Sequence, residues 1–173
     1  MKKQLLSTIL FFSLSGVLAQ NTPIIKVYAY SQAVLQGAKP SGAIEEGGKE
    51  IKVVADKRLN YFFYAEQKKS TVITIVSIWI KGKNYSAKAS LVSNTPVVLK
   101  SDDPSGSTEL VPKSANKIIL ITPGGEKMTT QKPSISIGRS ISTSELIIVY
   151  KSKGKTYYSE VKKIKELKTV AAV

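Results

Sequence analysis

The chain has 173 residues, its 26 basic residues outnumber its 12 acidic residues, and it contains neither cysteine nor histidine. Without these two residue types there is no Ser-His-Asp triad, no thiol nucleophile, no disulfide and no histidine or thiolate metal site. Carboxylate, lysine, tyrosine and hydroxyl chemistry remains, so the composition favours a non-enzymatic protein without a cofactor or metal.

Residues 1–19 have the pattern of a secretory signal peptide. Lys2 and Lys3 form a basic start, and the stretch from Leu5 to Leu18 is apolar apart from serine, threonine and glycine. Small residues precede a cleavage point after Ala19. Because the apolar stretch is shorter than the roughly 20 residues that span a bilayer, we expect cleavage rather than anchoring. The loss of two lysines then lowers the net charge from +14 to +12.

The remaining chain is predicted to be one exported domain. Residues 20–161 are expected to form the domain, and residues 162–173 a basic C-terminal tail. No later segment is apolar for long enough to span a membrane. An exported domain without disulfides fits a bacterium better than a eukaryotic secretory pathway, so we expect a periplasmic, cell-surface or secreted location.

The first half of the domain begins with strand patterns separated by a long loop. Residues 24–30 are rich in β-branched and aromatic side chains, as strands are. Residues 36–48 contain several glycines and a proline and indicate a loop. A short strand is expected at residues 51–55 and an aromatic strand at 59–65, closed by a polar turn at 66–70.

The strongest strand pattern is Thr71 to Lys81, which is apolar on both faces. Such a strand belongs inside a sheet that is covered on both sides, and we expect Trp79 to pack in the core. The segment Lys81-Gly82-Lys83-Asn84 is a turn signal. Residues 85–92 alternate in polarity, so the two strands are predicted to form a hairpin.

The second half contains a further predicted hairpin. Its strands are residues 145–150 and 156–161, joined by the turn Ser152-Lys153-Gly154-Lys155. Between the two hairpins, short strands are expected at 96–100 and 117–122. A turn at 123–126, an extended segment at 128–139 and a polar connector at 140–144 follow in chain order. No segment has the length and 3.6-residue period of a helix.

These segments predict an all-β domain of about seven to nine strands. Regular turn signals between short strands are typical of an antiparallel β-sandwich. We expect an immunoglobulin-like sandwich, with another β-sandwich or a small closed barrel as alternatives.

The basic excess is carried almost entirely by lysine. Its densest cluster combines the second hairpin tip with the C-terminal tail and consists of Lys151, Lys153, Lys155, Lys162, Lys163, Lys165 and Lys168. This cluster is a candidate patch for anionic partners. Lysine with very little arginine also suits a merely solvated surface, and no specific nucleic-acid motif is visible.

Four tyrosines are candidates for a contact surface because their strands look half-exposed: Tyr28, Tyr30, Tyr157 and Tyr158. The acidic side chains Glu45, Asp102, Asp103 and Glu109 are candidates for Ca²⁺ binding or for glycoside chemistry. The spacing of Asp102, Asp103 and Glu109 does not match an EF-hand, and the sequence around Asp102 is typical of a plain turn.

The sequence therefore predicts a structural, adhesive or accessory binding module of the bacterial cell envelope, whose partner is another envelope protein or an anionic glycan. One alternative is a carbohydrate-binding or carbohydrate-processing protein that uses the loop carboxylates. The other is a lysine-rich protein that binds anionic envelope polymers.

Overall fold

The computed structural model describes residues 22–35, 57–100, 106–126 and 135–171. About two thirds of them are in β-strands and the one helix among them is short, which confirms the predicted all-β class. Eight strands form one sheet in the order β10-β1-β2-β7-β4-β3-β8-β9, and β5 and β6 form a separate two-stranded ribbon. The strands are β1 (Ile24–Leu35), β2 (Lys57–Gln67), β3 (Thr74–Ile80), β4 (Lys83–Leu91), β5 (Val97–Leu99), β6 (Thr108–Val111), β7 (Lys117–Glu126), β8 (Leu146–Ser152), β9 (Lys155–Val161) and β10 (Lys165–Ala171).

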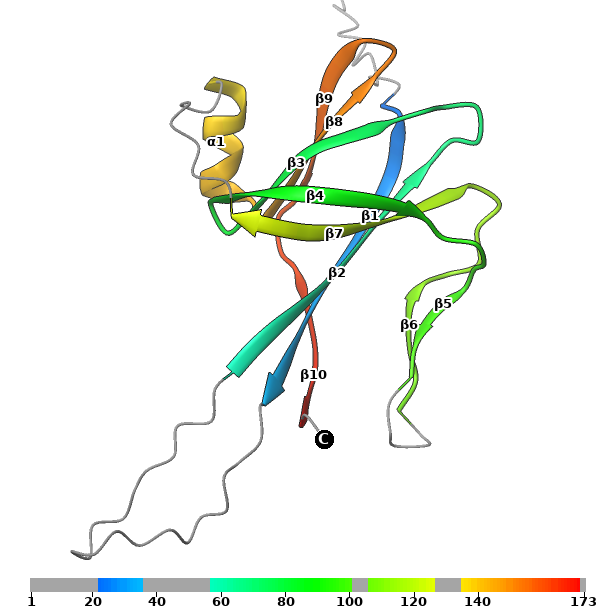
Figure 1. The fold of residues 1–173 in the computed structure, drawn as a ribbon, viewed down its shortest axis with the longest axis vertical. Coiled ribbons are helices and arrows are strands. Elements are labelled where there is room, and N and C mark those ends of the chain that lie inside the picture. The colour runs from blue at the N-terminus through cyan, green and yellow to red at the C-terminus, as the bar shows by residue number, and fades with distance from the viewer. Residues whose placement is uncertain (1–21, 36–56, 101–105, 127–134, 172–173) are drawn as a thin grey trace, which may run out of the picture.

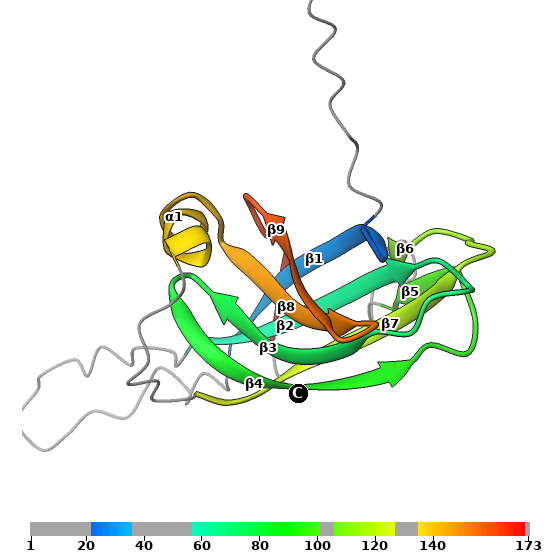
Figure 2. The same cartoon turned by 90° about the horizontal axis from the view of Figure 1, so that it is seen from above.

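The eight-stranded sheet curls on itself, as the view from above shows (Figure 2). All of its ladders are antiparallel except the one between β1 and β10, which is parallel. The expected sandwich of two stacked sheets is not confirmed. Sheets twist by a fixed hand, so one large sheet can bury its inner face by curling instead of by meeting a second sheet.

Both predicted hairpins are present. β3 pairs with β4 and β8 pairs with β9, each across a two-residue turn. The two central residues of each turn have positive φ: 47° and 84° at Lys81 and Gly82, and 49° and 74° at Lys153 and Gly154. Two successive left-handed residues are the signature of a type I′ turn, whose twist matches that of the flanking strands. Glycine supplies the second of them without steric cost.

The main hydrophobic core lies on the inner face of the curled sheet. Residues of five strands and one connection supply its buried side chains: Ile24, Ala29, Phe63, Ala65, Ile78, Ile80, Ile119, Ile121, Leu146, Ile148, Tyr150 and Ile164. The period of two along each strand places these residues on one face. The pairs Phe63–Ile121 and Ile78–Ile148 are directly opposite in the ladders, so the core is built from cross-strand contacts.

A second apolar cluster lies on the outer face of β1, β2 and β7, where the β5–β6 ribbon covers it. Tyr28 and Tyr64 from the sheet meet Leu110 and Val111 from β6, and all four are buried. The ribbon therefore gives these strands a second covered face. This local layering explains why β2 is apolar on both sides.

The segment expected to be extended at 128–139 and the connector at 140–144 instead contain a helix, α1 (Ile135–Thr143). Two buried serines four positions apart fasten its end to the sheet. Ser140 Oγ and Ser144 Oγ donate hydrogen bonds to the Glu160 carboxylate at 2.5 and 3.2 Å. Residues four apart lie on one helix face, so a tertiary contact with β9 supports a helix that its own serine-rich sequence does not favour.

Two other expectations differ from the structure. The Pro123-Gly124-Gly125-Glu126 segment is not a turn but the end of β7, where Pro123 pairs with Ala87 beside a register shift. Proline is tolerated in strands at such irregularities. Most of residues 162–173, expected to be a tail, forms β10 and belongs to the main sheet through its ladder with β1.

β3 is an interior strand, as its pattern predicts, but it begins at Thr74 and contains a register shift between Ile75 and Ser77. The shift leaves Val76 40% exposed. Trp79 is half-buried and not part of either described core cluster, so it is not the packing centre that we expected. It lies opposite Asn84 and Ile147 in the two neighbouring ladders.

Tyr150 is a core residue whose hydroxyl group lies in an apolar environment. Its side chain is fully buried and its ring is stacked on Tyr157, with 5.7 Å between ring centroids. Its hydroxyl has no hydrogen-bond partner among the described residues. An unpaired buried hydroxyl destabilises a fold, so Tyr150→Phe is expected to raise the free energy of unfolding by about 1 kcal/mol. Urea denaturation measures the change, and a loss of stability would mean that the hydroxyl is bound by a group such as an internal water.

Candidate functional site

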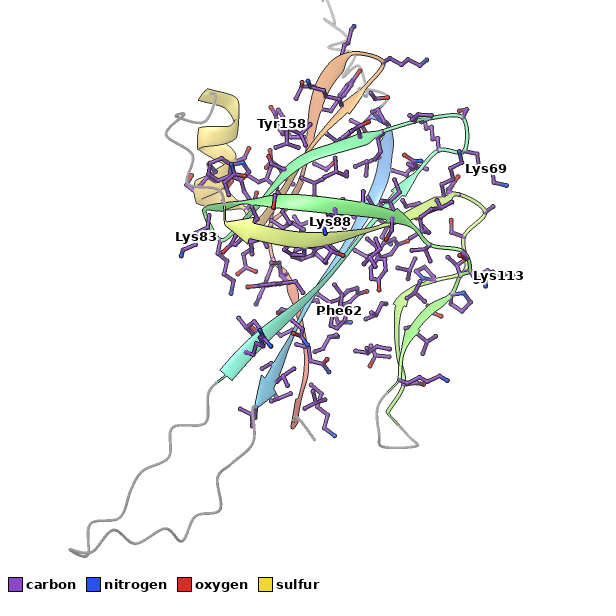
Figure 3. All side chains as sticks on the ribbon, viewed as in Figure 1. Phe62, Lys69, Lys83, Lys88, Lys113 and Tyr158 are labelled. Atoms are coloured by element: carbon purple, nitrogen blue, oxygen red, sulfur yellow. The ribbon has the colours of Figure 1, made fainter. Side chains whose placement is uncertain are left out.

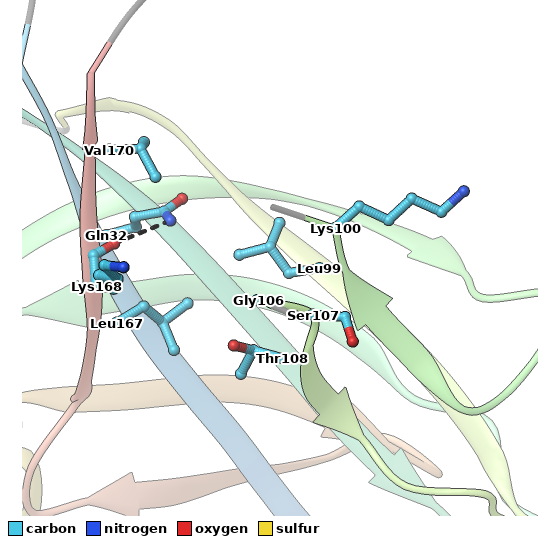
Figure 4. Close-up of a pocket in the computed structure, with 9 residues that line it drawn as sticks. All are labelled: Gln32, Leu99, Lys100, Gly106, Ser107, Thr108, Leu167, Lys168 and Val170. Atoms are coloured by element: carbon cyan, nitrogen blue, oxygen red, sulfur yellow. Dashed lines mark hydrogen bonds between the residues drawn. The ribbon is translucent and has the colours of Figure 1, made fainter. Parts of the chain in front are cut away.

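A pocket of about 270 Å³ lies between the ribbon and the strands β1 and β10 (Figure 4). Side chains and backbone from three separate parts of the chain form its walls: Gln32 from β1, Leu99, Lys100, Gly106, Ser107 and Thr108 from the ribbon and the residues next to it, and Leu167, Lys168 and Val170 from β10. Neither β10 nor the ribbon lines it alone. The pocket therefore exists only when the ribbon is docked and β10 is paired.

The ribbon wall is held by packing and by a hydrogen bond from β1. Leu99 and Leu167 are half-buried and pack against the cluster that contains Leu110. The Tyr30 hydroxyl donates a 2.8 Å hydrogen bond to the carbonyl oxygen of Leu110. On the other wall, Gln32 Nε2 donates a 3.1 Å hydrogen bond to the carbonyl oxygen of Lys168. These contacts fix the two walls relative to β1.

A buried carboxylate fixes the connection between the ribbon and β7. Glu66, at the end of β2, accepts hydrogen bonds from the Ser114 hydroxyl at 2.7 Å, the Asn116 amide at 2.8 Å and the Tyr28 hydroxyl at 2.9 Å. These bonds favour the charged form. The bond from Asn116, together with those from Ser114 and Tyr28, lowers the pKa of Glu66 although its burial acts in the opposite direction.

The same network acts on Tyr28. Burial, followed by the hydrogen bond and charge of Glu66, raises the pKa of Tyr28 to about 12. The Lys26 ammonium lies 4.8 Å from the centroid of the Tyr28 ring, within the range of a cation–π contact. Tyr28 thus remains protonated and works as a hydrogen-bond donor in the core.

The pocket combines an aliphatic surface with positive charge. Leu99, Leu167 and Val170 are its apolar side chains, and the exposed residues Lys100 and Lys168 line it from the ribbon and from β10. The Lys100 side chain points away from the other lining residues in Figure 4, so Lys168 is the nearer source of positive charge. Hydroxyls of Ser107 and Thr108 add hydrogen-bonding capacity. No carboxylate lines the pocket in the part of the chain that the structure describes, so this lining offers no acid and base pair.

The seven predicted lysines are all exposed, but they do not form one patch. Lys151, Lys153 and Lys155 are at the β8–β9 hairpin tip, whereas β10 carries Lys165 and Lys168, and the two regions are at opposite ends of the molecule in Figure 1. Lys162 and Lys163 lie in the connection between them. Figure 3 shows further lysines elsewhere, including Lys69, Lys83, Lys88 and Lys113. Of the predicted cluster, Lys168 is the member that lines this pocket.

The four predicted tyrosines have different surroundings. Tyr28 is 9% exposed, and Tyr30 is half-buried beneath the ribbon. Tyr157 points to the inner core and stacks on Tyr150. Tyr158, on the opposite face of β9, is 40% exposed. The first three are thus engaged in packing within the molecule.

The predicted carboxylates do not converge in the described residues. Glu109 is exposed on β6, and Glu45, Asp102 and Asp103 lie outside the described residues, as do the predicted signal peptide and the predicted strand at 51–55. The described ranges contain no group of three acidic side chains suited to a metal ion. They also contain no helix that is long and apolar enough to cross a membrane.

Sequence reasoning did not identify most of the pocket. Gln32, Leu99, Thr108 and Leu167 carry no motif, and they meet only because β10 pairs with β1 and the ribbon docks on the sheet. The alternation of Leu167 with its charged neighbours was the available signal for a strand. No protein-family model matches the chain, and no curated protein or solved structure is significantly similar to it.

Proposed function

We propose that the protein is an exported, non-enzymatic binding module of a bacterial cell envelope, and that its pocket receives a small amphipathic anion. The observation that carries this proposal is the placement of Lys168 at a pocket that also presents Leu99, Leu167 and Val170, with Lys100 at its rim. A carboxylate or phosphate on a short aliphatic body matches both halves of this lining.

Export and the lack of catalysis are supported by the sequence. The basic and apolar pattern of residues 1–19 is that of a signal peptide. The absence of histidine and cysteine removes the commonest general base and the commonest strong nucleophile. A periplasmic or surface location would expose the protein to lipids and glycans that bear acidic groups.

The lining of the pocket predicts how much of the binding free energy comes from the aliphatic body of the ligand and how much from its anionic group. Burial of aliphatic groups contributes about 0.8 kcal/mol for each methylene. The two lysines are exposed, so their attraction for an anion is screened by salt. The alkyl body should therefore supply most of the affinity, and the lysines should select the sign of the charge.

Octanoate tests this division. We expect octanoate to shift the amide NMR signals of Gln32, Thr108 and Leu167, whereas acetate, which lacks the chain, and octylammonium, which has the opposite charge, leave them unchanged. Lys168→Glu should weaken octanoate binding about tenfold, or 1.4 kcal/mol. Lys88→Glu, an exposed charge reversal on β4, is the matched control and should have no effect. Equal binding of octanoate and octylammonium would contradict the proposal.

A further inference from the structure

The curled sheet has an open edge along β9. In the sheet order β9 is an end strand, and its ladder joins it to β8 alone. The N-terminal half of β1 is open on one side as well, because its ladder with β2 starts at Ile24 while its ladder with β10 starts at Tyr30. No ladder joins β9 to β1 among the described residues. Open edges carry backbone N–H and C=O groups that can bind a further strand.

These two edges border a common groove. A cavity of about 470 Å³ lies between them and is lined by Thr22, Ile24, Ile25, Lys26, Val27, Ser159, Glu160, Val161 and Lys162. We call it the β1–β9 groove. Its two walls are therefore β-strands with an unpaired side. Some Cα atoms of β1 and β9 lie within 8 Å of each other, so an extended chain can pair with the edge of one wall but not with both walls at once along the whole groove.

The inner side of the β1–β9 groove is lined by apolar side chains, and its surface carries charged ones. On the inner side, Ile24 is buried and Val27 and Val161 are partly buried against the main core. At the surface, Lys26 and Lys162 are exposed, one on each wall. The carboxylate of Glu160 is already bound by Ser140 and Ser144 of the α1 region. An entering strand would thus meet apolar side chains on one face and ammonium groups on the other.

We propose that the β1–β9 groove binds an extended acidic segment of a partner polypeptide, which pairs with the open edge of β9. Successive side chains of a strand point to opposite faces, so the segment that fits alternates apolar and acidic residues. The backbone bonds supply affinity, and the alternate side chains supply specificity. This proposal does not depend on the ligand of the pocket beside the ribbon.

The positive charge of the protein favours an acidic partner over a second copy of the chain. The protein carries a formal net charge of +14, and β9 itself has Lys155 at its start and is followed by Lys162 and Lys163. Lysines at a sheet edge discourage pairing between identical edges. The same lysines attract an acidic strand and steer its approach.

The test uses the fluorescein-labelled peptide Glu-Val-Glu-Val-Glu-Val-Glu and the full chain. We expect saturable binding by fluorescence anisotropy, and slower hydrogen exchange at the amides of β9 in the complex. The same peptide with N-methyl groups at alternate residues keeps its charge but loses donors along one edge, so its binding should be at least about tenfold weaker. Equal binding of both peptides would show attraction by charge alone and would overturn the proposal.

Single substitutions test whether the acidic peptide binds in the β1–β9 groove. Lys162→Glu should weaken binding of the acidic peptide about tenfold, and the control Lys88→Glu, on the outer side of β4, should not. The peptide Lys-Val-Lys-Val-Lys-Val-Lys should not bind to the native chain. Absence of binding by the acidic peptide, or unchanged hydrogen exchange in β9 when it binds, would also overturn the proposal. Octanoate binding should remain intact in Lys162→Glu, which separates this site from the pocket.

Discussion

Replacing Glu66 by alanine is expected to lower the free energy of unfolding by about 2–4 kcal/mol, because three neutral donors, buried or partly buried, lose their acceptor and a buried donor left unpaired costs roughly 1–3 kcal/mol. The substitution leaves three donors without their acceptor: the Tyr28 hydroxyl, the Ser114 hydroxyl and the Asn116 amide. Each unpaired buried group adds its own desolvation cost. Urea denaturation followed by circular dichroism measures the loss. Glu109→Ala, on the exposed face of β6, is the control and should change stability by less than about 0.5 kcal/mol.

The pH dependence of Glu66→Gln provides a second readout of the same group. The pKa of Glu66 lies below its ordinary value of 4.5 in the folded protein. A depressed pKa stabilises the fold above the unfolded-state pKa, and this stabilisation is lost as the pH falls through the folded-state pKa. The stability difference between native and Glu66→Gln proteins should therefore be largest near neutral pH and shrink as the pH falls below 4.5. A constant difference would show that the charge of Glu66 does not matter.

Replacing Leu110 by alanine is expected to cost about 2–5 kcal/mol, as for other buried leucines. Leu110 is 2% exposed and lies at the centre of the cluster that joins the ribbon to β1, β2 and β7. The cavity would loosen the ribbon, which supplies Leu99, Lys100 and Thr108 to the pocket. We therefore expect octanoate binding to fall together with stability.

The ribbon also offers a matched control for Leu110. Val98 is on β5 and is 45% exposed, so Val98→Ala should leave both stability and octanoate binding nearly unchanged. Denaturation and NMR titration should be made on both variants at a temperature at which each is folded. If Leu110→Ala lost stability but kept native affinity for octanoate, the ribbon would not be a wall of the binding site.

The local β-structure could be predicted because its signals are short-range. Gly82 and Gly154 mark turns that need a positive φ, and the apolar alternation of the flanking strands fixes which residues pair. The long-range arrangement could not be predicted in this way. Periodicity shows that a strand has a buried face, but it does not show whether a second sheet or the same curled sheet covers that face.

The errors at α1 and β10 have a related cause. Ser140 and Ser144 favour a connector by local propensity, and only their contact with Glu160, far along the chain, explains the helix. Residues 165–171 look like part of a basic tail in the sequence. Their partner strand is β1, which lies far away in the sequence, so no local pattern shows the pairing. In both places a tertiary contact decides the structure.

Only the positive charge of the candidate site could be predicted from the sequence. Lys168 belongs to the lysine cluster that the sequence highlights, but its neighbours Leu99 and Gln32 come from segments with no functional motif. Tyr28 and Tyr30 were expected at a contact surface because their strand looks amphipathic. The ribbon covers that face instead, and no local pattern indicates where a two-stranded ribbon will dock.

The parallel pairing of β1 with β10 determines at what point in its synthesis the protein can finish folding. The bond between Gln32 and Lys168 joins residues that are 136 positions apart. During synthesis from the N-terminus, β1 is made first among the described strands and β10 last. Contacts of such large sequence separation form slowly. A nascent chain can therefore fold its hairpins early, while the pocket wall supplied by β10 must wait until nearly the whole described sequence has been made.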